Sequence, residues 1–186
     1  MGTHIEGSDV EDFGRWIELG LKYNPKMIFY IQDVWPRLTD VIRGGQLTGG
    51  ANPKLEPYEK RMDGINDFVA ERVEALNEKF GDKVFVIPVG NGMRELVRMQ
   101  LDGKLPGVDE IFVSKNDERG RVGLYRDSIH PSRIVAQLEG YIYFACLYKK
   151  NPAEVPGKGV ENPELDKILR QVAWKVATEH PHSGVK

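Results

Sequence analysis

Two continuous apolar segments, each preceded by an amphipathic helical pattern, constrain the fold of this chain more than any other feature. Residues 27–34 and 83–89 are rich in β-forming residues and do not alternate with polar ones, which is typical of strands buried on both faces. Apolar residues recur at helical spacing over 13–21 and 58–80, just ahead of the two segments. This alternation predicts a parallel sheet with helices on both of its faces.

Weaker signals predict the remaining elements: a long loop or lid over 35–57, a turn at 90–92, a short helix over 93–101, a loop over 103–125 with a short strand at 111–113, and helices over 134–148 and 165–176. We therefore expect an α/β domain over residues 1–152. The linker and C-terminal helix of residues 153–186 are expected to pack on the same domain. Only two strands are strongly indicated, which is few for a three-layer fold. The predicted sheet is therefore incomplete.

Charge and composition exclude several classes of partner. The chain has 186 residues, with 26 basic and 28 acidic side chains and a net charge of −2, so it lacks the basic excess of a nucleic-acid-binding protein. The longest apolar run, around residues 27–31, is far too short to span a bilayer. No signal peptide is predicted, and the sequence does not indicate the cellular compartment.

Cys146 is the single cysteine, which excludes an internal disulfide and a cysteine-based zinc site. We expect it to be a buried, inert thiol.

His130 is the histidine whose sequence context indicates chemistry. It follows Asp127 by three residues and precedes Pro131. This spacing lets a carboxylate reach one ring nitrogen of an imidazole while the other ring nitrogen faces a nucleophile. A helix-capping aspartate beside a surface histidine is the alternative interpretation. The two C-terminal histidines, His180 and His182, are expected to be exposed in a polar tail, and no metal site is predicted.

The segment around His130 resembles a known family of enzymes. The stretch Tyr125-Arg126-Asp127-Ser128-Ile129-His130-Pro131-Ser132, running on to Gly140–Tyr143 and Asn151-Pro152, is similar to the last conserved block of SGNH (GDSL-type) serine ester hydrolases. The apolar strand at 27–34 followed by Trp35, and the segment 86–90, are similar to later strands of that family. The resemblance covers roughly residues 1–152.

This resemblance implies a three-layer α/β/α sandwich with a parallel sheet, of SGNH or flavodoxin-like type, that is N-terminally incomplete. It implies hydrolysis of a small-molecule or carbohydrate ester, with Asp127 as the acid and His130 as the base of a triad. No cofactor is needed for that chemistry. The family's nucleophilic serine lies in a Gly-Asp-Ser motif, and this chain contains no such motif. The nucleophile is therefore missing or unidentified.

Four further residues form the predicted oxyanion and substrate-binding set. Gly2 and His4 stand where the family's third block, Gly-x-Asn-Asp, would lie, with His4 in place of the asparagine. An ordinary chain start with an exposed histidine is the alternative. Trp35, at the end of a strand, either walls a pocket for an acyl group or a sugar or covers the edge of the core. Asn91, in the turn after the second strand, completes the set.

Two hypotheses follow from these patterns. The chain is either a hydrolase of SGNH type, or a catalytically silent domain of that type that binds a ligand or a partner protein. An incomplete parallel sheet also leaves an apolar edge without a partner strand. We therefore expect either self-association across that edge or its coverage by the N-terminal segment or the C-terminal helix.

Overall fold

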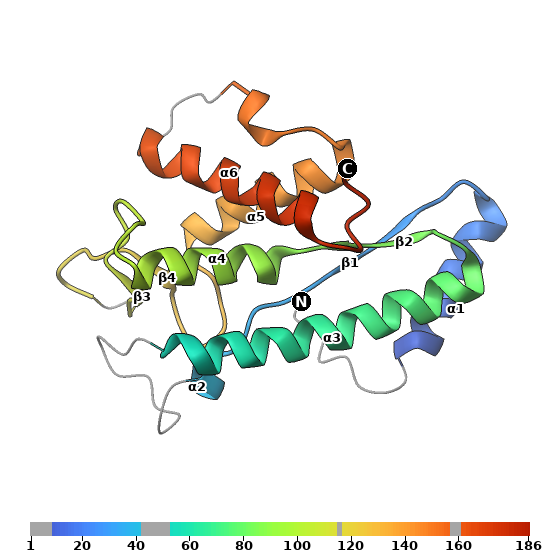
Figure 1. The fold of residues 1–186 in the computed structure, drawn as a ribbon, viewed down its shortest axis with the longest axis horizontal. Helices are drawn as coiled ribbons and strands as arrows, with labels where there is room; N and C mark the ends of the chain where they lie inside the picture. The colour runs from blue at the N-terminus through green and yellow to red at the C-terminus, as the bar shows by residue number, and fades with distance from the viewer. Residues whose placement is uncertain (1–8, 42–52, 115–116, 157–160) are drawn as a thin grey trace.

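The computed structural model describes residues 9–41, 53–114, 117–156 and 161–186, which form a mixed α/β chain (Figure 1). Gly2, His4 and Ser8 lie outside the described residues. In chain order the elements are α1 (Asp9–Tyr23), β1 (Phe29–Gln32), α2 (Leu38–Val41), α3 (Leu55–Phe80), β2 (Val84–Ile87), α4 (Val89–Leu101), β3 (Glu110–Phe112), β4 (Gly123–Tyr125), α5 (Arg133–Tyr148), the 3-10 helix η1 (Pro152–Glu154) and α6 (Pro163–Glu179).

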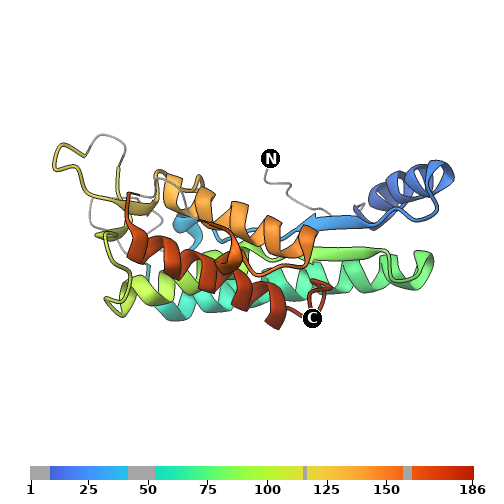
Figure 2. The same cartoon turned by 90° about the horizontal axis from the view of Figure 1, so that it is seen from above.

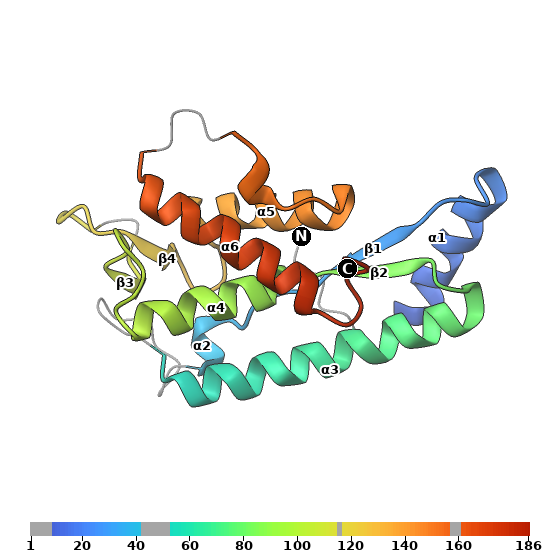
Figure 3. The same cartoon turned by 45° about the horizontal axis from the view of Figure 1, so that its top comes forward.

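Strands β1 and β2 pair in parallel, with Phe29 opposite Val84, and helices lie on both faces of the pair. Ile31 of β1 packs with Ile17 of α1 and with buried residues of α3. On the other face the Tyr30 hydroxyl donates to the carbonyl of Cys146 in α5 (3.2 Å). Figure 3 shows α3 on one side of this pair, and α5 and α6 on the other.

The sheet content is smaller than a full sandwich requires. Strands β3 and β4 form a second parallel pair that is not joined to β1 and β2. The parallel α/β character predicted from the sequence is confirmed, but the described residues contain two separate two-stranded sheets in place of one continuous sheet. Figure 2 shows α1 projecting at one end of the molecule.

Three predictions of local secondary structure are wrong. Residues 123–125 form β4 instead of a loop, because a three-residue strand that begins with glycine carries no readable periodicity. The loop predicted over 35–57 contains α2 and, from Leu55, the first turn of α3. Residues 90–92 form no separate turn, because α4 begins at Val89. A Cβ atom at Gly90 would overlap the carbonyl of Val34, so glycine lets α4 start directly against the end of β1.

The C-terminal tail is docked, not solvated as predicted. The amide of Val86 in β2 donates to the carbonyl of His182 (2.8 Å), and the buried Ser183 hydroxyl donates to the carbonyl of Ala177. His180 and His182 are half-buried, and Val185 joins the main core. The tail folds back because Val185 packs into the main core and the His182 carbonyl accepts a hydrogen bond from the Val86 amide on the outer edge of β2.

The two outer edges of the β1–β2 pair differ. On β2, the side-chain amide of Asn77 binds both the N–H and the C=O of Val84 (2.9 Å each), and the tail binds Val86. On β1, no described strand lies beyond the edge. The apolar core itself lies mainly between α4, α5 and α6 and the β3–β4 pair, so α6 shares its core with the helices that precede it.

Candidate functional site

Asp127 and His130 lie in a tight turn between β4 and α5. One carboxylate oxygen of Asp127, Oδ1, accepts hydrogen bonds from the backbone amides of Ile129 (2.9 Å) and His130 (2.7 Å). The other oxygen, Oδ2, lies 2.7 Å from Nδ1 of the His130 ring. The turn is closed by the Arg126 amide, which donates to the carbonyl of His130 (3.1 Å). The structure thus brings the two predicted residues into direct contact.

The hydrogen bonds of the turn keep Asp127 ionised and thereby set the tautomer of His130. Partial desolvation acts to raise the pKa of Asp127, but the backbone amides of His130 and Ile129 and the His130 ring outweigh it and lower that pKa to about 2. An ionised carboxylate can only accept hydrogen bonds. The proton shared with it therefore belongs to Nδ1 of His130, and in the neutral ring Nε2 carries the free lone pair. This is the arrangement of a general base held by a carboxylate.

The far side of the His130 ring is open. The His130 side chain is 58% exposed and that of Asp127 is 48% exposed. Within the described part of the chain, no hydrogen bond joins the ring to the hydroxyl of Ser128 or Ser132. Ser183 is engaged in the C-terminal tail. The described serines that flank the histidine therefore do not act as its hydrogen-bond partners, and Nε2 is available to a substrate or to a group supplied from elsewhere.

Trp35 is hydrogen-bonded to the backbone of the turn that holds the pair. Its indole Nε1–H donates to the carbonyl of Ile129 (2.8 Å), inside the Asp127–His130 turn. The backbone amide of Leu38 donates to the carbonyl of Ser128 in the same turn (2.9 Å). The Trp35 ring also packs against the main core. The structure therefore places Trp35 under the turn, where it contacts the turn backbone.

Asn91 belongs to a different polar cluster. Its side chain donates to the carboxylate of Asp33 (2.9 Å) and to Asn66 (2.9 Å) and accepts from Arg94 (2.8 Å). The residue is only 8% exposed. Among the described contacts, none links its side chain to Asp127 or His130. A role for Asn91 in binding substrate stays a prediction, and it would require these bonds to be exchanged.

Asp33 is a buried carboxyl group that the sequence analysis did not single out. It directly follows β1, is 1% exposed, and accepts a hydrogen bond from the Gly90 amide in the first turn of α4 (2.6 Å). Desolvation raises the pKa of Asp33 to about 7, against the opposing effect of its hydrogen bonds to Gly90 and Asn91. The signal for it was a carboxylate placed immediately after a mostly apolar strand. It ties the end of β1 to the start of α4.

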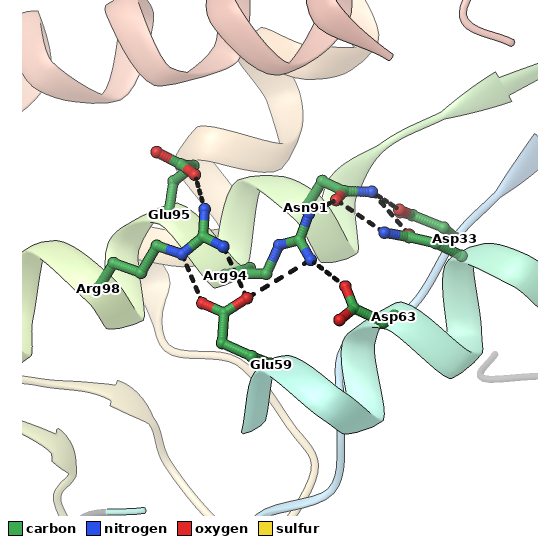
Figure 4. Close-up of polar contacts among 8 residues, drawn as sticks. Asp33, Glu59, Asp63, Asn91, Arg94, Glu95 and Arg98 are labelled. Atoms are coloured by element: carbon green, nitrogen blue, oxygen red, sulfur yellow. Dashed lines mark hydrogen bonds and ion pairs between the residues drawn. The ribbon is translucent and has the colours of Figure 1, made fainter. Parts of the chain in front are cut away.

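A charged network continues from this cluster across α3 and α4 (Figure 4). Arg94 pairs with Asp63 (2.9 Å), and Arg98 pairs with Glu59 (2.5 Å) and Glu95 (2.5 Å). The network borders a cleft of about 410 Å³ that also reaches α6 and the C-terminal tail. Because these guanidinium groups are matched by carboxylates, the cleft presents alternating charge and no cationic surface.

The remaining predicted features can be placed briefly. Cys146 is fully buried, and burial raises the pKa of its thiol to about 11, so it is unreactive at neutral pH. The described residues contain no cluster of three or more side chains suited to hold a metal ion. No helix in the described ranges has the length and apolar character needed to cross a membrane.

Comparisons of the chain with protein families, with curated proteins and with solved structures find no match.

Proposed function

We propose that this chain provides the acid–base half of a serine ester hydrolase of SGNH type that acts on a small-molecule or carbohydrate ester. The observation that carries the proposal is the 2.7 Å contact between Asp127 Oδ2 and His130 Nδ1, in a turn that leaves Nε2 open. A base in this state accepts the proton of an attacking hydroxyl at Nε2 and later donates it to the leaving alcohol. Asp127 holds the ring and stabilises the imidazolium.

The nucleophile is the missing part of this proposal. It is either a serine not yet identified or a water molecule activated by His130. The oxyanion would be stabilised by backbone amides and by Gly2 and His4. The three-layer sandwich belongs to the same proposal. Helices on both faces of β1 and β2 support it.

The test is hydrolysis of short-chain aryl esters by the purified chain and by His130→Ala. A matched control is His182→Ala, since His182 also lies near a carboxylate (3.6 Å from Glu74) but outside the turn. The proposal expects activity that falls roughly 100-fold or more in His130→Ala and stays within a factor of two or so in the control. Equal background hydrolysis by all three proteins would contradict it.

A catalytically silent domain that binds a ligand or a partner protein is the second candidate. The exposed ring of His130, with no described hydroxyl bonded to it, favours this candidate. Loss of a triad member leaves only residual catalysis. The same assay separates the two, because a silent domain shows no dependence on His130.

We further propose that the chain self-associates across the outer edge of β1. An apolar groove of about 210 Å³ lies where α1 and α3 meet β1 and β2, and it is lined in part by Trp16, which is 70% exposed. Charged side chains and proline usually protect an edge strand from pairing with another chain. Residues 27–32 contain neither. Ile28→Lys should convert an oligomer to a monomer in light scattering, whereas Leu101→Lys, at a similarly exposed site on α4, should not. A wild-type monomer at micromolar concentration would refute this.

A further inference from the structure

The segment that follows β1, residues 35–38, is bonded to the turn that contains the candidate acid and base. Trp35 Nε1–H donates to the carbonyl of Ile129 (2.8 Å), and the Leu38 amide donates to the carbonyl of Ser128 (2.9 Å). Close by, the buried Tyr125 hydroxyl donates to the carbonyl of Pro36 (2.9 Å). The end of one sheet therefore supports the turn that leaves the other sheet.

The two carbonyls held in this way belong to the two peptide groups that bind Asp127. The Ile129 carbonyl and the His130 amide form one planar peptide unit, and that amide donates to Asp127 Oδ1 (2.7 Å). The Ser128 carbonyl and the Ile129 amide form the preceding unit, and its amide donates to the same oxygen (2.9 Å). Described peptide bonds are all trans. In a planar trans peptide the C=O and N–H point in opposite directions, so holding the carbonyl aims the amide.

We propose that Trp35 is a positioning residue for the acid–base pair. Its indole N–H fixes the peptide plane between Ile129 and His130, and that plane directs the His130 amide at the Asp127 carboxylate. The carboxylate is then oriented to accept a hydrogen bond from the Nδ1–H of His130. This inference deepens the proposed function, on which its catalytic meaning rests, but its geometric content concerns the turn alone.

The role assigned to Trp35 differs from simple coverage of the core. A phenyl ring would cover the core edge nearly as well as an indole ring, but it has no N–H to donate. Removing that donor leaves the Ile129 carbonyl without its partner and lets the peptide plane rotate. The hydrogen bond from the His130 amide to Asp127 then weakens, and with it one of the interactions that favour the ionised carboxylate.

The test compares Trp35→Phe with Trp174→Phe by NMR titration of the Asp127 carboxyl carbon and the His130 ring nitrogens. Trp174 is a matched control, because it is a partly buried tryptophan packed against the same core. We expect Trp35→Phe to raise the pKa of Asp127 by about 1, a tenfold weaker preference for the ionised form, and to reduce the population of the Nδ1–H tautomer of His130. Trp174→Phe should leave both unchanged.

Unchanged titration of Asp127 and His130 in a folded Trp35→Phe variant would overturn the proposal. If that variant does not fold, the wild-type chain decides: a scalar coupling across the hydrogen bond from Trp35 Nε1 to the Ile129 carbonyl carbon is expected, and its absence would equally overturn the proposal. Neither measurement uses ester hydrolysis. A chain without esterase activity would therefore refute the proposed function while leaving this test of the turn intact.

Discussion

The buried carboxyl group of Asp33 makes a quantitative prediction about how stability depends on pH. Its pKa is about 7 in the folded chain, against an ordinary value of 3.8. The folded state therefore binds more protons than the unfolded state between these two values, so the stabilisation from this group is present at low pH and is lost as the pH rises. Summed over pH 5 to pH 7, the loss is about 2 kcal/mol.

A second group opposes this change in the wild-type chain. Burial lowers the pKa of His180 from 6.5 to about 4, with smaller effects from His182 and Arg94. The unfolded state then binds more protons as the pH falls, and the chain loses about 2 kcal/mol from His180 between pH 7 and pH 5. The two contributions nearly cancel, so the wild-type chain alone cannot reveal either of them.

The variant Asp33→Asn separates the two contributions. Its amide cannot titrate, and its N–H₂ group would face the donor of Asn91 (2.9 Å from the present oxygen), so its absolute stability falls at every pH. The informative quantity is the change in the free energy of unfolding from pH 5 to pH 7, measured by urea denaturation. We expect the wild type to lose about 2 kcal/mol relative to the variant over this range. Identical changes in both proteins would refute a raised pKa at Asp33.

Three other predictions concern packing. Gly64→Ala should stabilise the chain by about 0.5–1 kcal/mol, because nothing lies near its Cβ position inside α3. Gly90→Ala should destabilise it by roughly 3 kcal/mol, because the added Cβ would overlap the carbonyl of Val34. Thermal unfolding measures both changes. Cys146 should resist thiol reagents at pH 8 in the folded chain and react fully in guanidinium, and rapid labelling of native protein would contradict its burial. Ser183→Ala should cost about 1–2 kcal/mol, because the Val185 amide (3.1 Å from the hydroxyl) loses its acceptor. Unchanged stability would show that the Ser183 hydroxyl contributes nothing to the docked tail.

The strongly periodic segments of the sequence predicted the helices and strands best. The patterns over 13–21 and 58–80 correspond to α1 and α3, and the apolar runs at 27–34 and 83–89 correspond to β1 and β2. These segments could be predicted because each buries one continuous stripe or face. Strand β4 could not be predicted, because three buried residues are too few to show a periodic pattern.

The candidate site likewise contains one contact that the sequence predicts and others that it does not. Asp127 and His130 could be paired from their spacing, since three residues of a turn bring a side chain back to its own backbone. The hydrogen bond from Trp35 to the Ile129 carbonyl could not be foreseen, because it joins residues 94 positions apart. Asn91 was placed in a turn because glycines flank it, but tight packing against Val34 makes Gly90 part of a helix.

The measurement that tests the account most directly is the tautomer of His130 at neutral pH, read from its ring ¹⁵N chemical shifts in the wild type and in Asp127→Asn. We expect a protonated Nδ1 and an unprotonated Nε2 in the neutral wild-type ring, because the Asp127 carboxylate lies 2.7 Å from Nδ1. In Asp127→Asn this preference should be lost. A wild-type ring protonated at Nε2, or an equal preference in both proteins, would contradict the claim that Asp127 and His130 form a poised acid–base pair.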